Sequence, residues 1–221
     1  PLHQPVDYLS AFGSRDIHGH APLVPVDDQI GPALATGDGG RIRCHTAMGL
    51  VAQTFQEHDL SRLPGHIAIG HTRYSTTGSN QHSNAQPIRV TGPHGEIAVA
   101  HNGNLVNASE LRDTLIREGA IFQTNSDTEV VLHLYAKSTA STAEDAIVES
   151  VSQVSGAFSL VLLTPDSLIA VRDPHGFRPL ALGRIGDAYV VCSETCAMDL
   201  IGAEYVREVE PGEVLVIGKH G

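Results

Sequence analysis

Three short polar stretches of the sequence carry side chains that could bind and activate an amide substrate. They read HTRYSTTG at 71–78, HNGNL at 101–105 and NSDTE at 125–129. A guanidinium such as that of Arg73 can hold a carboxylate through two parallel hydrogen bonds, and the Asp127 carboxylate can hold an ammonium group. The side-chain N–H of Asn102 and the backbone N–H of Gly103 can form an oxyanion hole, because glycine allows a close backbone approach. Such a set fits the head group of an amino acid and the tetrahedral intermediate of an amide under cleavage.

Each of these side chains also has a purely structural explanation. Arg73 alone is typical of a surface ion-pair partner, and Asn102-Gly103 is a dipeptide typical of a type I′ turn. Asp127, near the start of a predicted helix, can stabilise the helix dipole and its free N–H groups. The catalytic interpretation therefore requires the three stretches to line one cleft. In that cleft Arg73 and Asp127 should face each other across roughly one amino-acid head group.

The hydrophobic pattern predicts the strands that must position these stretches. Residues 67–74 read as a strand that leads into a polar loop, and residues 87–100 read as a hairpin. The first two polar stretches therefore follow strands. The predicted elements after residue 155 are strands over 157–164, 167–172, 180–184, 188–193 and 213–217, and a short helix near 195–201.

Three helices are predicted between the hairpin and the later strands. Two have capping-box spacing, because Asn107 lies three residues before Glu110 and Ser126 lies three residues before Glu129. The third covers about residues 143–154 and carries its apolar side chains on one face. The third polar stretch therefore opens a helix.

This order of strands, helices and strands predicts an α+β fold with mainly antiparallel sheets, not a doubly wound parallel sheet. Strands such as residues 158–163 are apolar on both faces, so each must be covered on both sides. Two stacked sheets with helices outside satisfy that requirement. Residues 1–40 show no sustained apolar period, and we expect residues 1–31 to be the least well-packed part of the chain.

Composition excludes several classes of protein. The 221 residues are 41% hydrophobic, enough to bury a sizeable core in one large or two small domains. A formal net charge of −11 argues against a nucleic-acid partner. No apolar run is long enough to span a membrane, and no secretory signal is visible. Three cysteines do not build a disulfide framework, which favours a cytoplasmic protein.

The three polar stretches belong to a longer series of motifs, which runs through roughly four-fifths of the chain. The motifs are GHTRYSTTG at 70–78, NAQP at 84–87, AHNGNLVN at 100–107, TNSDTEV at 124–130, VRDPHGFRPL at 171–180, SETCAMD at 193–199 and IGAEYVREVEPGE at 201–213. In order and spacing they resemble the glutaminase domain of the amidophosphoribosyltransferase family, a class II glutamine amidotransferase domain. The resemblance runs over residues 41–221. That family catalyses the first committed step of purine nucleotide (IMP) synthesis.

The resemblance implies a fold and a mechanism. The fold is the four-layer α-β-β-α sandwich of hydrolases with an N-terminal nucleophile. In the family a cysteine at the start of the mature chain attacks the glutamine amide, and its own α-amine handles the proton. Ammonia and a thioester result, and water then releases glutamate. Family roles fall on Arg73 for the substrate carboxylate, on Asp127 for its ammonium group, and on Asn102 with Gly103 for the oxyanion.

In the complete family enzyme, ammonia reaches a second domain and displaces pyrophosphate from phosphoribosyl pyrophosphate. That domain would lie beyond Gly221, so the chain is expected to be a fragment. No cofactor is expected in this segment. The resemblance implies Mg²⁺, and in some members an iron–sulfur cluster, for the full-length enzyme. It also implies a homo-oligomer, with no nucleic-acid or membrane partner.

The beginning of the sequence departs from the family. The opening CGVFG and an LQHRGQES-like stretch are missing from residues 1–31, and Pro1 stands first. Residues 1–40 are therefore expected to be a segment unlike the family, through a frame error, divergence or remodelling. Without the N-terminal cysteine, the chain is expected to be inactive as written. The alternative is a non-catalytic glutamine-binding or regulatory module derived from the family.

Other residues could in principle replace the missing nucleophile or bind a metal. Pro1 could act as a base through its secondary amine, and Cys44 could be an internal nucleophile. Cys192 and Cys196 have a C-x-x-x-C spacing, but no second pair supplies further ligands, so a metal site is not predicted. The thirteen histidines are scattered, without an HExxH pattern.

Overall fold

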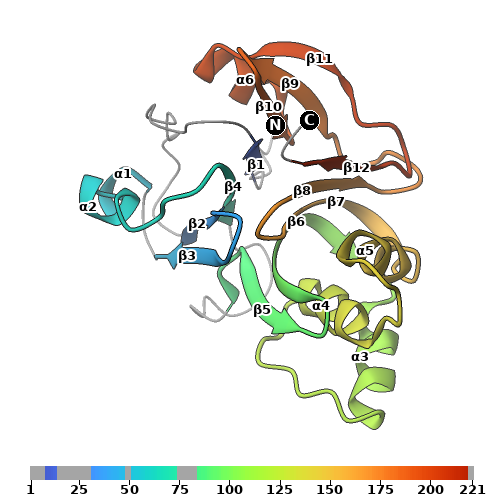
Figure 1. The fold of residues 1–221 in the computed structure, drawn as a ribbon. Coiled ribbons are helices and arrows are strands. Elements are labelled where there is room, and N and C mark those ends of the chain that lie inside the picture. Colours follow the sequence, from blue (N-terminus) through green and yellow to red (C-terminus); the bar gives the residue numbers. More distant parts are fainter. Residues whose placement is uncertain (1–7, 14–30, 48–50, 74–83, 219–221) are drawn as a thin grey trace.

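The structure, a computed structural model, describes residues 8–13, 31–47, 51–73 and 84–218. Side chains are described from residue 34 onward, apart from those of Ala52 and Arg73. The described residues form two stacked sheets with helices on the outer faces, a four-layer α+β sandwich (Figure 1). Every strand pairing among them is antiparallel, which confirms the predicted fold class.

One sheet contains seven strands in the order β11-β9-β10-β1-β4-β2-β3. Their bounds are β1 Tyr8–Gly13, β2 Gly31–Gly37, β3 Ile42–Thr46, β4 Ile67–Arg73, β9 Ala181–Ile185, β10 Ala188–Cys192 and β11 Glu204–Glu208. β1 lies in the middle, where Ala11 pairs with Val191 on one side and with Ile69 on the other.

The position of β1 corrects the prediction that residues 1–31 are the least well-packed part of the chain. A central strand is held by backbone hydrogen bonds to both neighbours. For residues 8–13 the prediction is therefore wrong. Residues 1–7 and 14–30 lie outside the described part of the chain.

The second sheet has five strands in the order β12-β8-β7-β6-β5. Their bounds are β5 Ile88–Gly92, β6 Gly95–Leu105, β7 Gly156–Leu163, β8 Leu168–Arg172 and β12 Val214–Ile217. β6 continues five residues beyond the predicted end of its hairpin, to Leu105, which pairs with Gly156. The HNGNL stretch therefore lies inside a strand and not after one.

The helices cover the outer faces of the sandwich. Their bounds are α1 Val51–Thr54, α2 Glu57–Leu60, α3 Ala108–Arg117, α4 Thr128–Lys137, α5 Ala143–Val151 and α6 Thr195–Ile201. Alternate residues of β6 divide between two cores. Ile97 and Val99 join the core beneath α3, α4 and α5, whereas Ala98 and Ala100 join the core between the sheets. In the described part of the chain, no helix is long and apolar enough to cross a membrane.

Neither of the two predicted capping boxes forms. The Asn107 side-chain amide donates to the Gln153 carbonyl at 2.9 Å, and its oxygen accepts from the Ser155 N–H at 2.8 Å. Asn107 therefore ties α3 to the loop before β7. Glu129 turns back to the loop that precedes α4, and its carboxylate does not reach the Ser126 N–H, which is held by another side chain.

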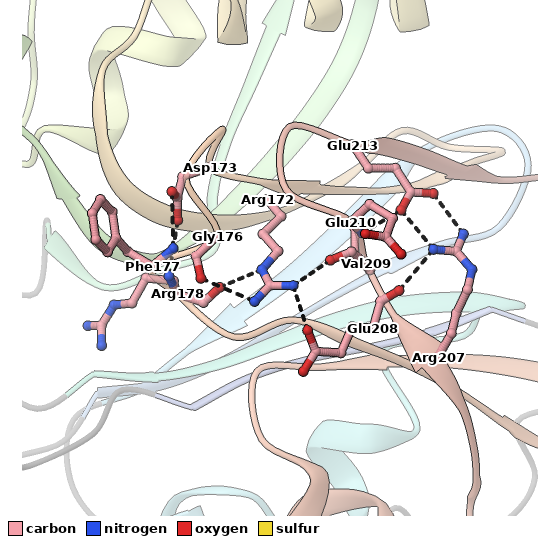
Figure 2. A network of polar contacts seen from close by, with 10 residues as sticks. All are labelled: Arg172, Asp173, Gly176, Phe177, Arg178, Arg207, Glu208, Val209, Glu210 and Glu213. Carbon is pink, nitrogen blue, oxygen red and sulfur yellow. Dashed lines mark hydrogen bonds and ion pairs between the residues drawn. The ribbon is translucent and has the colours of Figure 1, made fainter.

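Arg172, the last residue of β8, connects the two sheets (Figure 2). Its Nη1 donates to the Glu208 carboxylate at 2.9 Å and to the Val209 carbonyl at 2.7 Å, at the end of β11 in the other sheet. Its Nε donates to the Arg178 carbonyl and its Nη2 to the Gly176 carbonyl, at 2.9 and 3.1 Å. The Arg172 side chain is only 8% exposed. The VRDPHGFRPL and EVEPGE motifs thus connect the end of β8 to the end of β11 in the other sheet.

Candidate active site

Asn102 is fully buried in the middle of β6, where its backbone pairs with Ser159 of β7. It follows Ala98 and Ala100 in the alternation of the strand, and these two side chains belong to the core between the sheets. The Asn102 carboxamide is therefore placed by a strand that is paired throughout its length, on the face that is turned toward the seven-stranded sheet.

Gly103 has a backbone conformation that only glycine adopts without strain, with φ of +141°. A Cβ atom at this position would lie 2.1 Å from the Ala157 carbonyl oxygen and 2.8 Å from Phe158 Cα. β6 and β7 therefore approach each other too closely here for any side chain. The interpretation of Asn102-Gly103 as a turn is wrong, because the glycine serves a close approach between two paired strands.

Asp127 directly precedes α4, and its carboxylate is turned toward β6. Its Oδ2 accepts the Leu105 N–H at 2.9 Å, and its Oδ1 lies 3.5 Å from His101 Nδ1. The carboxylate thus contacts β6 on both sides of the Asn102-Gly103 pair. It makes no capping hydrogen bond to its own helix. The carboxylate still interacts with the Thr128 N–H at the start of α4, so the structural explanation holds beside the contacts with β6.

The environment keeps the Asp127 carboxylate ionised. Burial raises the pKa of this carboxyl, but the hydrogen bond and electrostatic interaction with His101 and the N–H groups of Leu105 and Thr128 lower it more. The net pKa lies below its ordinary value. Since the side chain remains 27% exposed, an ammonium group can still reach it.

A buried polar cluster joins three of the motifs behind this carboxylate. The Gln86 side chain accepts the His101 N–H at 2.7 Å and donates to the Thr128 hydroxyl at 3.1 Å. The Thr128 oxygen lies 3.1 Å from His101 Nδ1. Gln86, His101 and Thr128 are all at most 5% exposed. Sequence reasoning gave these three residues no role, although each lies inside a quoted motif, NAQP, HNGNL or TNSDTEV.

Arg73 is the last residue of β4, where its backbone pairs with Gly31 of β2. Its side chain lies outside the described part of the structure. The structure therefore brings the Asp127 carboxylate to the strand that carries Asn102 and Gly103, while the position of the Arg73 guanidinium stays a prediction.

The cysteines do not offer an evident substitute for the family nucleophile. Burial raises the pKa of the Cys44 thiol to about 11, and its Sγ lies 3.7 Å from the Pro87 carbonyl oxygen. At neutral pH this sulfur is a thiol, whereas the nucleophile must be a thiolate. Cys192 is buried in β10 and Cys196 is exposed on α6. Among the described residues, no group of three or more His, Cys, Asp or Glu could hold a metal ion.

Comparison with solved structures identifies the class of protein to which this sandwich belongs. Over 97% of the chain, the fold matches glutamine phosphoribosylpyrophosphate amidotransferase from Bacillus subtilis, solved with ADP and GMP, with a TM-score of 0.85 and 41% identity. The chain covers 48% of that structure. The fold is thus that of the N-terminal nucleophile hydrolases, as the motifs predicted.

The sequence comparisons then define the family. Residues 71–199, more than half of the chain, match the family described as the glutamine amidotransferase domain, and the chain belongs to that family. It is 46% identical over 194 residues to amidophosphoribosyltransferase of Bacillus subtilis, covering 87% of this chain and 41% of that protein. It is 55% identical over 177 residues to the chloroplastic amidophosphoribosyltransferase 2 of Arabidopsis thaliana, covering 80% and 32%. The chain spans less than half the length of these relatives.

Proposed function

We propose that the chain is the glutaminase half of an amidophosphoribosyltransferase. In the whole enzyme, the ammonia released from glutamine would react with phosphoribosyl pyrophosphate in purine nucleotide synthesis. The observation that carries this proposal is the Asp127 carboxylate, which is anchored on both sides of Asn102-Gly103, has a lowered pKa and remains partly exposed. The solved relatives supply the second substrate, phosphoribosyl pyrophosphate, and the pathway, purine biosynthesis.

The proposed mechanism assigns one role to each residue. The ammonium group of glutamine binds to the Asp127 carboxylate, and its carboxylate binds to Arg73. A cysteine thiolate attacks the side-chain amide carbon, and the oxyanion accepts hydrogen bonds from the Asn102 side-chain N–H and the Gly103 backbone N–H. The C–N bond then breaks and the nitrogen leaves as ammonia, with a proton delivered by the α-ammonium of the cysteine. Water hydrolyses the thioester to glutamate.

The nucleophile decides between this function and the alternative. Residue 1 of this sequence is Pro, and burial keeps the Cys44 thiol protonated. We therefore expect a polypeptide of residues 1–221 to bind glutamine without cysteine-dependent turnover. The alternative is a glutamine-binding or regulatory module. Replacing residues 1–31 with a Cys-initiated family-like segment separates the two, because only a glutaminase domain would then release glutamate.

The remaining assignments rest on the family alone. Phosphoribosyl pyrophosphate would be bound by the part of the relatives that this chain does not cover, and the full-length enzyme would be a homo-oligomer. No step of the proposed mechanism passes through Mg²⁺ or an iron–sulfur cluster. A cytoplasmic location is proposed because the three cysteines do not build a disulfide framework.

Glutamine binding tests the proposal directly. A titration followed by NMR chemical shifts measures the dissociation constant, and Asp127→Asn removes the charge while keeping the shape of the side chain. We expect this change to weaken glutamine binding about 10- to 100-fold, the equivalent of about 1.5–3 kcal/mol for a hydrogen bond to a charged group. The analogue 4-carbamoylbutanoate lacks the α-ammonium, and its binding should not change. Asp113→Asn, exposed on α3, is the control. Equal losses for both ligands would contradict the role of Asp127.

A further inference from the structure

The loop that precedes α4, residues 123–127, is fixed by side chains from both neighbouring helices. Glu129, in the first turn of α4, is 6% exposed and uses both of its carboxylate oxygens on this loop. Its Oε1 accepts the Gln123 N–H at 2.8 Å. Its Oε2 accepts both the N–H and the hydroxyl of Thr124, each at 2.7 Å. The donors at the start of the loop are thus bound by one buried carboxylate.

Arg112 of α3 binds the carbonyl groups of the same loop. Its Nη1 donates to the Thr124 carbonyl at 3.0 Å, and its Nη2 donates to the Ser126 carbonyl at 2.7 Å. The guanidinium lies 4.0 Å from the centre of the Phe122 ring, so its plane is held by stacking. A guanidinium presents its donors in a rigid fork, which suits two carbonyl groups at a fixed separation.

The residue that follows this loop has an unusual conformation for its position. Asp127 occupies the N-cap of α4, where backbone angles are ordinarily extended and an Asp side chain bonds to its own helix. Here φ is −63° and ψ is −29°, and the side chain makes no capping bond. The carboxylate is instead directed at the Leu105 N–H of β6. The backbone is helical at this residue, the Ser126 Oγ accepts the Thr128 N–H at 3.3 Å, and the loop directly before it is bound by Arg112 and Glu129.

We propose that Arg112 and Glu129 are positioning residues: they hold loop 123–127 so that the Asp127 carboxylate meets β6 beside Asn102-Gly103 and receives the substrate ammonium. The inference deepens the proposed function, because it names two residues that set recognition of the α-ammonium without touching the substrate. Their hydrogen bonds run to the backbone of the loop and to the Thr124 hydroxyl. Arg112 also stacks on Phe122, and Glu129 Oε1 lies 3.6 Å from His133 Nε2 on its own helix. Binding constellations tolerate displacements of only about 0.5 Å, so release of the loop should cost affinity.

The test compares Arg112→Ala and Glu129→Gln with a matched control. Arg117→Ala removes an exposed arginine from the same helix, whose guanidinium bonds to Thr114 within that helix. We expect Arg112→Ala and Glu129→Gln to weaken glutamine binding about tenfold, the equivalent of about 1.4 kcal/mol. Arg112→Lys keeps the charge without the fork and should restore only part of the affinity. Binding of 4-carbamoylbutanoate should be unchanged in every variant.

A second readout does not depend on glutamine. The Leu105 amide donates to Asp127, whereas the neighbouring Val106 amide donates to the Ser155 carbonyl at 2.8 Å. Release of the loop should therefore speed hydrogen exchange at Leu105 relative to Val106. General destabilisation would speed both amides alike.

The two readouts separate the inference from the function on which it rests. Unchanged relative exchange at Leu105 in both variants would overturn the inference, even if glutamine binds. Faster exchange at Leu105 in a chain that does not bind glutamine would support the positioning of Asp127 and refute the proposed function. Equal losses for glutamine and 4-carbamoylbutanoate would show that the two residues act on the fold and not on ammonium recognition.

Discussion

Replacement of Gly103 by Ala should be among the most damaging single-methyl changes in this protein. The added Cβ would lie 2.1 Å from the Ala157 carbonyl oxygen, in a residue with φ of +141°. The neighbouring atoms belong to the backbone of β7, so no flexible side chain can move aside. The two strands must separate by more than 1 Å to restore an ordinary contact, and local ladder hydrogen bonds must break.

The expected loss of folding free energy is the sum of a conformational cost and the cost of the broken hydrogen bonds. An unfavourable backbone conformation costs about 1–3 kcal/mol, and about two lost hydrogen bonds cost about 1 kcal/mol each. The sum is about 3–5 kcal/mol, a large part of the 5–15 kcal/mol that is typical of a folded domain. Gly95, the first residue of β6, is the matched control, because its φ is +100° but nothing lies within 4 Å of its virtual Cβ. Gly95→Ala should therefore cost only the conformational part.

Urea unfolding followed by circular dichroism measures the difference. With a denaturant slope of about 2 kcal/mol per molar, Gly103→Ala should lower the midpoint by about 1 M more than Gly95→Ala does. If the two variants unfold at the same urea concentration, the strands can separate at no cost. The requirement for glycine at this position would then have to come from the chemistry of the site and not from strand packing.

Three further predictions follow from other parts of the molecule. Asp127→Asn should lower the free energy of unfolding near pH 6, and the difference between the two proteins should shrink as the pH falls below 3.8. A carboxyl whose pKa is lowered in the folded protein contributes stability above its unfolded pKa, and this stability is lost when the carboxyl is protonated. Urea unfolding of both proteins across this range checks the sign. Arg172→Met should lower the free energy of unfolding by about 3–5 kcal/mol, because it leaves the buried Val209 carbonyl and other acceptors unpaired. Thermal unfolding measures this difference, and a decrease below about 1 kcal/mol would contradict the role of Arg172 in connecting the two sheets. Cys44, whose thiol has a pKa of about 11, should react with iodoacetamide at pH 7.5 far more slowly than the exposed Cys196, as peptide mass spectrometry of a time course will show.

Much of the fold could be predicted because strands and helices differ in their apolar period. The strand over 157–164 is observed as Gly156–Leu163, and the helix near 195–201 is observed as Thr195–Ile201. β1 could not be found in this way. It is held by backbone pairing on both sides, and pairing between residues 11 and 191 leaves no local trace in the sequence.

The candidate site shows a different limit. Residue types and spacing singled out Asn102, Gly103 and Asp127, which the structure places on neighbouring elements, yet the local rule for an Asn-Gly dipeptide gave the wrong geometry. An Asn-Gly dipeptide favours a turn only where the chain is free to turn. Here β6 stays paired with β7 through these residues, so the same glycine accommodates a close strand.

Asp127 illustrates why local patterns fail at such a site. Its own helix offers free N–H groups and a favourable dipole, and a local rule directs the carboxylate there. The carboxylate also accepts the Leu105 N–H of β6, because Arg112 and Glu129 fix the preceding backbone from two different helices. These partners are 15 residues before and 2 residues after Asp127, on different helices, and only the packed structure brings them to one loop. The Asp127 side chain remains 27% exposed in this arrangement, and that exposed part is what a ligand can reach.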